Sequence, residues 1–118
     1  MSDWAAIRER YLRDSLETRL GGLAANLLRI GTLSRRPGYS DIVARLVRES
    51  GLFIEWTAKD VPAGPLVELA ELQRTLVRWH HKWPEVWSDD SRRAQVAADA
   101  ASWSGRVLEM SGLSRRGA

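Results

Sequence analysis

The sequence predicts an all-α protein, an up-down antiparallel four-helix bundle. Along most of the chain, apolar residues return every three or four positions, which is the spacing of one helix face. Prolines and glycines are few, and they divide the chain into four stretches at Pro37-Gly38, Gly64-Pro65 and Pro84. The connections of about five to seven residues suit antiparallel neighbours. No stretch shows the two-residue alternation of a half-buried strand.

The first stretch, residues 3–34, is the longest. Its stripe of apolar residues is spaced four, three, four and three positions apart: Leu16, Leu20, Leu23, Leu27 and Ile30. We expect one long or kinked helix, which would reach roughly 45 Å and overhang its neighbours. The alternative is a break at Gly21-Gly22, which would give five helices.

The second stretch, residues 40–57, has one broad apolar face. We expect Ser40 to cap its N-terminus. Gly51 interrupts this helix at a cost of about 1 kcal/mol relative to alanine. The face comprises Ile42, Val43, Leu46, Val47, Ser50, Phe53, Ile54 and Thr57.

The third stretch, residues 65–83, has the clearest periodicity. Pro65 suits a first helical turn, and Pro84 disfavours the α conformation at the residue before it, so we expect the helix to stop or kink there. The stripe consists of Leu69, Leu72, Leu76, Trp79 and Trp83. We therefore expect Trp79 and Trp83 to fill the core.

The fourth stretch, residues 89–112, repeats this rhythm. Asp89 or Asp90 could cap its start, and Gly112 is a natural stop. The apolar stripe consists of Val96, Ala100, Trp103, Val107 and Met110.

The composition bounds the class of protein. The 118 residues fit one domain, which we place at residues 1–113 with a flexible basic tail at 114–118. Cysteine is absent, which excludes a disulfide framework and a cysteine nucleophile. The apolar runs are too short to cross a bilayer and no secretory signal is visible, so we expect a cytoplasmic protein.

The charge does not indicate strong nucleic-acid binding. The net charge is +3, and without Arg115 and Arg116 of the tail it is +1. This is too small for a strong field acting on phosphates.

A recognition surface is predicted at the end of the bundle that carries the first connection. Arginine and tryptophan are favoured anchors of protein interfaces. The surface would consist of Arg35, Arg36, Tyr39, Trp87, Arg92 and Arg93. Its partner would be another protein. Nucleic acid is the weaker alternative.

Self-association is predicted from the N-terminal overhang. Trp4, Ile7 and Tyr11 extend an apolar face beyond the bundle. Without a partner inside the monomer, this strip would be covered by a second copy, giving a homodimer.

No metal site or cofactor is expected. The two histidines, His80 and His81, are adjacent and would point about 100° apart on a helix, so they cannot both bind one ion from one face. However, Arg74 precedes them by six and seven residues. This spacing resembles the Arg-x(4–6)-His motif of the HEPN-type helical ribonucleases. That resemblance implies cleavage of an RNA backbone by a dimer, with Arg74, His80 and His81 as catalytic residues.

The leading interpretation of the sequence is a small non-enzymatic module for protein interaction or regulation. The alternative is a helical protein that cleaves or binds RNA.

Overall fold

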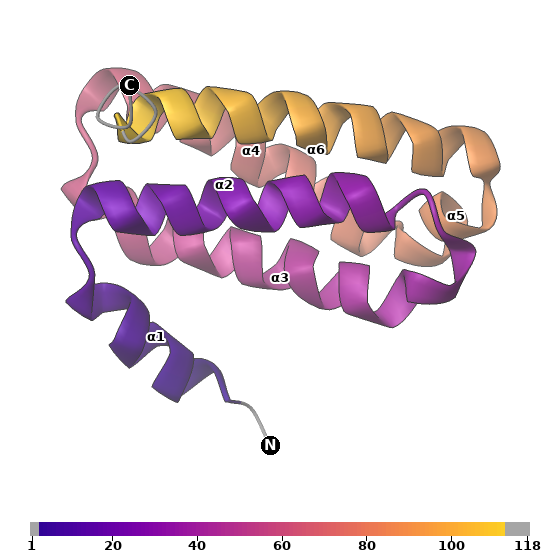
Figure 1. Cartoon of the computed structure of the whole chain (residues 1–118), viewed down its shortest axis with the longest axis horizontal. Coiled ribbons are helices and arrows are strands. Elements are labelled where there is room, and N and C mark those ends of the chain that lie inside the picture. The colour runs from indigo at the N-terminus through magenta and orange to yellow at the C-terminus, as the bar shows by residue number, and fades with distance from the viewer. Residues whose placement is uncertain (1–2, 113–118) are drawn as a thin grey trace.

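A computed structural model describes residues 3–112, and all its regular secondary structure is helical (Figure 1). The predicted all-α class is confirmed. The tail that we expected at 114–118 lies outside the described residues. The α-helices are α1 Trp4–Arg13, α2 Leu16–Leu33, α3 Ser40–Thr57, α4 Ala63–His81, α5 Trp83–Ser88 and α6 Asp90–Ser111, with short 3₁₀ turns η1 Pro37–Tyr39 and η2 Ala58–Asp60.

Four long helices, α2, α3, α4 and α6, lie alongside one another and successive ones run in opposite directions (Figure 1). Two short helices flank them. The described residues therefore form six α-helices, and the prediction of four is wrong in its count. None of the described helices is long and apolar enough to span a membrane.

The first predicted helix is divided in two, and the division does not fall at Gly21-Gly22, which lie inside α2. It falls at Asp14, whose backbone is extended, and at Ser15, whose side chain accepts a hydrogen bond from the Thr18 backbone N–H at 3.2 Å. This cap satisfies one of the free amides of the first turn of α2. The buried Arg19 side chain stabilises the corner, since its Nε donates to the Asp14 carbonyl at 3.2 Å.

Two details of α3 also differ from the prediction. Ser40 is the first helical residue and does not cap the helix; its Oγ instead accepts a hydrogen bond from Trp83 Nε1 at 3.2 Å. Ile42 is 46% exposed and does not belong to the buried face.

The ends of α6 are as predicted. The Asp89 carboxylate accepts hydrogen bonds from the backbone N–H groups of Ser91 and Arg92. Gly112 ends the helix in the left-handed conformation at φ 76°, which favours glycine.

The stop predicted before Pro84 is confirmed, but a further short helix follows it. Helix α4 ends at His81, and α5 begins at Trp83 with Pro84 in its first turn. Proline suits this position because its missing N–H would have no helical partner there.

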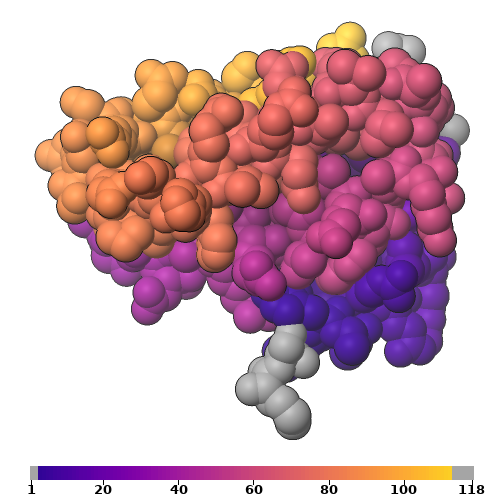
Figure 2. Space-filling model, turned by 180° about the vertical axis from the view of Figure 1, so that it is seen from behind, coloured from indigo at the N-terminus to yellow at the C-terminus, as the bar shows by residue number. Residues whose placement is uncertain are grey.

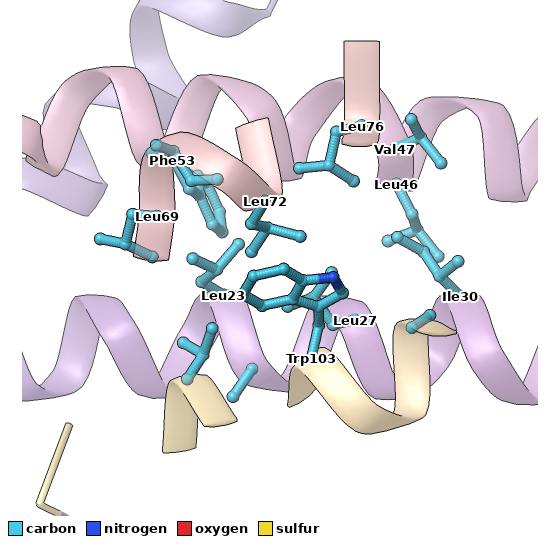
Figure 3. Close-up of a cluster of buried hydrophobic side chains, with 14 of the residues drawn as sticks. Leu23, Leu27, Ile30, Leu46, Val47, Phe53, Leu69, Leu72, Leu76 and Trp103 are labelled. Carbon is cyan, nitrogen blue, oxygen red and sulfur yellow. The ribbon is translucent and has the colours of Figure 1, made fainter. Parts of the chain in front are cut away.

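The core is formed by the inward faces of the four long helices. Trp103 of α6 lies at its centre among Leu23, Leu27 and Leu72 (Figure 3). Trp79 is buried and Trp83 is half-buried against the same cluster, as predicted.

Helices α2 and α6 make the most extensive contact in the protein. A Cβ added at Gly31 of α2 would lie 3.1 Å from the Ala97 carbonyl oxygen and 3.5 Å from the Ala101 nitrogen of α6. About two helical turns from Gly31, Ser104 Oγ of α6 donates to the Ala24 carbonyl of α2 at 2.7 Å. Small residues thus allow the two backbones to approach closely.

Replacing Gly31 by alanine should destabilise the protein. The added methyl group would lie 3.1 Å from a backbone carbonyl oxygen of α6, closer than ordinary contact, so we expect Gly31→Ala to lower the free energy of unfolding by about 1–2 kcal/mol in urea denaturation. Gly105→Ala is the control, because nothing lies within 4 Å of that Cβ position. It should raise stability by about 0.5–1 kcal/mol. Equal stability of the two variants would contradict the close approach of α2 and α6.

Candidate functional site

The predicted recognition surface lies at the end of the bundle that holds η1, α5 and the start of α6, which we call the η1 end (Figure 1). The Trp87 side chain makes contacts within the protein there. Its Nε1 donates to the Pro37 carbonyl at 2.8 Å, and its ring lies 5.3 Å from that of Trp83 between centroids. The indole therefore ties α5 to η1.

Arg93 is also engaged within the chain. Its side chain is only 13% exposed, pairs with Asp90 and donates from Nη1 to the Trp87 carbonyl at 2.7 Å. The guanidinium lies 5.6 Å from the centroid of the Trp87 ring. Arg93 thus braces the turn between α5 and α6.

The remaining four residues of the predicted surface divide by exposure. Tyr39 is half-buried against the core, whereas Arg35, Arg36 and Arg92 are exposed. The three arginines are the part of this surface that a partner could reach.

The N-terminal strip is not an overhang, which corrects the sequence prediction. Tyr11 is buried, and its ring stacks on Phe53 of α3 with centroids 3.9 Å apart and planes 12° apart. Its hydroxyl donates to the Arg19 carbonyl at 2.8 Å. Ile7 is half-buried against the core, and the Arg45 guanidinium lies 4.5 Å from the centroid of the Trp4 ring. Helix α1 folds back onto α3 because Asp14 and Ser15 turn the chain.

The ribonuclease-like residues are all exposed on α4. Arg74 and His81 are seven residues apart and therefore share one face, two turns from each other. His80 lies about 100° away and borders a groove with α3. The structure thus separates His80 from the other two. Within residues 3–112, no group of three or more potential ligands could hold a metal ion.

The groove between α3 and α4 was not predicted from the sequence. It has a volume of about 190 Å³ and lies on the side of the molecule where these two helices meet (Figure 2). We call it the α3–α4 groove. The residues that line it are Val47, Arg48, Gly51, Leu52 and Glu55 of α3 and Gln73, Leu76, Val77 and His80 of α4.

A buried polar atom lies beside this groove without a partner. Gln73 Oε1 is shielded from solvent and accepts no hydrogen bond among the described residues. It faces Gly51, where an added Cβ would lie 3.4 Å away. A buried acceptor left unpaired costs about 1–3 kcal/mol, and because this atom is shielded, a donor in the groove reaches it only if the Gln73 side chain moves.

The two ends of the α3–α4 groove carry opposite charges. Arg48 and Glu55 are two turns apart on α3, a rise of about 10 Å. Because α4 runs antiparallel and Gln73 lies opposite Gly51, His80 lies toward the Arg48 end. That end points toward the exposed arginines of the η1 end, whereas Glu55 points away from them.

Gly51 was the one sign of the groove in the sequence. Its backbone φ is not positive, so its conformation does not require glycine. What the missing side chain provides is space beside Gln73.

No protein-family model matches the chain, and neither the curated proteins nor the solved structures compared with it show significant similarity. The function is therefore inferred from geometry alone.

The ionisation of Tyr11 should make stability depend on alkaline pH. Burial raises the pKa of Tyr11 from 10.0 to about 12, because the anion would lose its hydration. The folded state thus holds this proton more tightly, and its contribution to stability is complete below pH 10.0 and is lost as the pH rises toward 12. Urea denaturation across this range should show a falling free energy of unfolding. The fall should be smaller in Tyr11→Phe, and an equal fall in both proteins would contradict the burial of the hydroxyl.

Gly51→Ala should stabilise the protein. The new methyl group would contact only the end of the flexible Gln73 side chain, and alanine favours the helix. We expect the free energy of unfolding to rise by about 0.5–1 kcal/mol, measured by thermal and urea denaturation. A loss of stability would show that Gly51 is needed for packing and that the space beside it is not open.

Proposed function

We propose that the protein is a non-enzymatic interaction module that binds a segment of another protein in the α3–α4 groove. The observation that carries this proposal is the groove itself, which has the exposed Val77 at its edge and Gly51 in its wall. The missing side chain of Gly51 leaves space between the two helices that a ligand side chain can fill.

The apolar character of the groove supports a protein ligand. Val77 at its edge is 57% exposed, and Leu52 is half-buried. A partner side chain that enters between Leu52 and Val77 would remove this apolar surface from water, at about 25 cal/mol per Å². A few side chains that fill pockets of this kind dominate the binding energy of protein interfaces.

The charges near the groove support a defined orientation of the partner. Arg48 and His80 border one end, and beyond it lie Arg35, Arg36 and Arg92. None of Arg35, Arg36 and Arg48 is in a described ion pair or side-chain hydrogen bond. Acidic groups of the partner would therefore lie against Arg48, Arg35 and Arg36, and away from the exposed Glu85, Asp89 and Asp90 of the η1 end.

The histidines carry no observation that points to catalysis. A catalytic base needs a nucleophile or an orienting group within hydrogen-bond distance. Neither His80 nor His81 makes a side-chain hydrogen bond among the described residues. The alternative from the sequence is RNA cleavage through Arg74, His80 and His81. An RNase assay with the purified protein tests it. Cleavage of RNA by the wild-type protein that is lost in His81→Ala would replace the binding role.

A side chain that fills the groove should abolish binding of the partner protein. Gly51→Leu places a side chain where the ligand would lie, whereas Gly105→Leu places the same side chain on open surface of α6. Wild-type, Gly51→Leu and Gly105→Leu proteins, each shown to fold by circular dichroism, would be used for quantitative capture from the native host. We expect one binding protein with wild type and Gly105→Leu, and at least tenfold less of it with Gly51→Leu, because filling the site removes an anchor of about 1.4 kcal/mol or more.

Equal capture of that protein by all three variants would refute the groove as the binding site. A purified complex with a measurable Kd, weakened by Gly51→Leu and not by Gly105→Leu, is the required confirmation.

A further inference from the structure

We infer that the outward face of the α2–α6 pair is an interface with a second copy of this chain, which gives a two-fold symmetric dimer. This face lies on the side of the molecule seen in Figure 1, whereas the α3–α4 groove lies on the side seen in Figure 2. The dimer therefore does not depend on the proposed function and leaves the groove of each copy open.

Helix α6 carries a second stripe at helical spacing, on the side that faces solvent. The stripe consists of Ala94, Ala98, Ala101, Gly105 and Leu108, which are spaced four, three, four and three positions apart. All of these residues are exposed, Leu108 to 38%. None of them is charged or has a polar side chain.

Helix α2 carries a matching stripe beside it. The stripe consists of Gly21, Ala25, Leu28 and Thr32, which are spaced four, three and four positions apart. Leu28 is 56% exposed. The Thr32 hydroxyl donates to the Leu28 carbonyl at 3.1 Å, so this polar group is already satisfied within α2.

The distribution of charge supports an interface on this face. In a chain in which 28% of the residues are charged, two neighbouring stripes carry no charge. The outward side of α4, by contrast, exposes Arg74, Arg78 and His81. Charged side chains border the α2–α6 face, with Arg29 on the far side of the α2 stripe and Glu109 on the far side of the α6 stripe. A centre depleted of charge within a polar rim is typical of protein interfaces.

The contacts between α2 and α6 fix the relative position of the two stripes. Gly31 approaches Ala97, and Ser104 donates to the Ala24 carbonyl. In this antiparallel register, Ala101 is level with the middle of the α2 stripe. A single two-fold axis can therefore pass through the centres of both stripes.

A two-fold axis at this level, lying in the interface and perpendicular to the helices, makes the α2 stripe complementary to itself. It lays α2 antiparallel on α2 of the second copy, with Leu28 against Ala25. The same operation brings Thr32 against Gly21. Each larger residue meets a smaller one, and the two-fold symmetry repeats both contacts.

The same axis makes the α6 stripe complementary to itself. Leu108 lies against Ala94 of the second copy, and Gly105 lies against Ala98. Ala101 lies on the axis and meets the same residue of the second copy. Residues this small allow helix axes to approach to about 8 Å, which is the short end of helix packing distances.

The area of the face is sufficient for a dimer. Helices α2 and α6 contain 18 and 22 residues, so they are about 27 and 33 Å long. Side by side they present roughly 600 Å², and two copies would cover about 1,200 Å² in total. This is the low end of the range for specific interfaces, so we expect a Kd on the order of 1 μM.

Sedimentation velocity of the full chain measures this dimer directly. Between about 1 μM and 1 mM, the mass should rise from that of one 13.3 kDa chain to that of two. A protein that is still monomeric at about 1 mM would overturn the inference.

A charge placed on the axis locates the interface. Ala101→Glu would bring two carboxylates against each other, so we expect it to raise the Kd of the dimer by about a hundredfold or more. Ala70→Glu is the matched control, because it places the same charge at an exposed alanine of α4, and it should leave the Kd unchanged. Circular dichroism would show that both variants fold. An unchanged Kd in Ala101→Glu, or an equal rise in both variants, would overturn the inference.

A mixture of opposite charges tests the axis itself. Ala101→Lys should also dissociate the dimer on its own. Mixed with Ala101→Glu, it should form a heterodimer that binds about tenfold or more tighter than either variant binds itself, because opposite charges then meet. Misfolding of the variants could not produce this rescue. A mixture that stays monomeric would overturn the two-fold axis at Ala101.

The dimer and the partner are tested by separate variants. Gly105→Leu adds a side chain to the α2–α6 face only, so it should weaken the dimer and still capture the partner protein. Gly51→Leu should keep the dimer and lose the partner. A loss of the dimer in Gly51→Leu would overturn the assignment to the α2–α6 face, whereas capture of the partner by Gly51→Leu would refute only the proposed function.

Discussion

The close contact between α2 and α6 is the constraint on which the rest of the bundle depends. Gly31 removes the side chain that would meet the Ala97 carbonyl, and Ser104 bonds to the backbone of α2. On the opposite side of α6 the spacing is set by large residues. Trp79 and Trp103 lie between α4 and α6, whose backbones stand farther apart. A bundle with one narrow side and one wide side follows from this distribution of residue sizes.

The α3–α4 groove lies on another seam of the bundle. Helices α3 and α4 are in direct contact, and the groove lies along that contact. Gly51 deepens this seam where a larger residue would close it. Glycine at position 51 makes the helix less stable than alanine would, and proteins often accept such a loss of stability at binding sites. The proposed role as an interaction module explains why glycine is present there.

Periodic spacing was sufficient to predict the long helices. The stripes that begin at Leu69 and Val96 are buried except for their last residues, Trp83 and Met110, which are half-buried. Asp89 and Gly112 bound α6 as expected because their capping chemistry is local. The break at Asp14 and Ser15 was missed although the step from Tyr11 to Leu16 is five residues, because the decisive cap involves only one side-chain hydrogen bond. Trp87 and Arg93 resemble interface anchors in sequence, but tertiary contacts far along the chain occupy them. The groove could not be predicted, since it requires knowing that Gly51 faces Gln73, whereas in the sequence Gly51 only weakens a helix.

Native-state hydrogen exchange tests the central claim most directly, because it measures the stability of each helix separately. The amides of α2 and α6 around Gly31 and Ala97 should exchange only through global unfolding, with the highest protection in the protein. Those of α3 and α4 beside the groove should open at a lower free energy. Exchange in α2 and α6 by local opening, while α3 and α4 remain protected, would contradict the account.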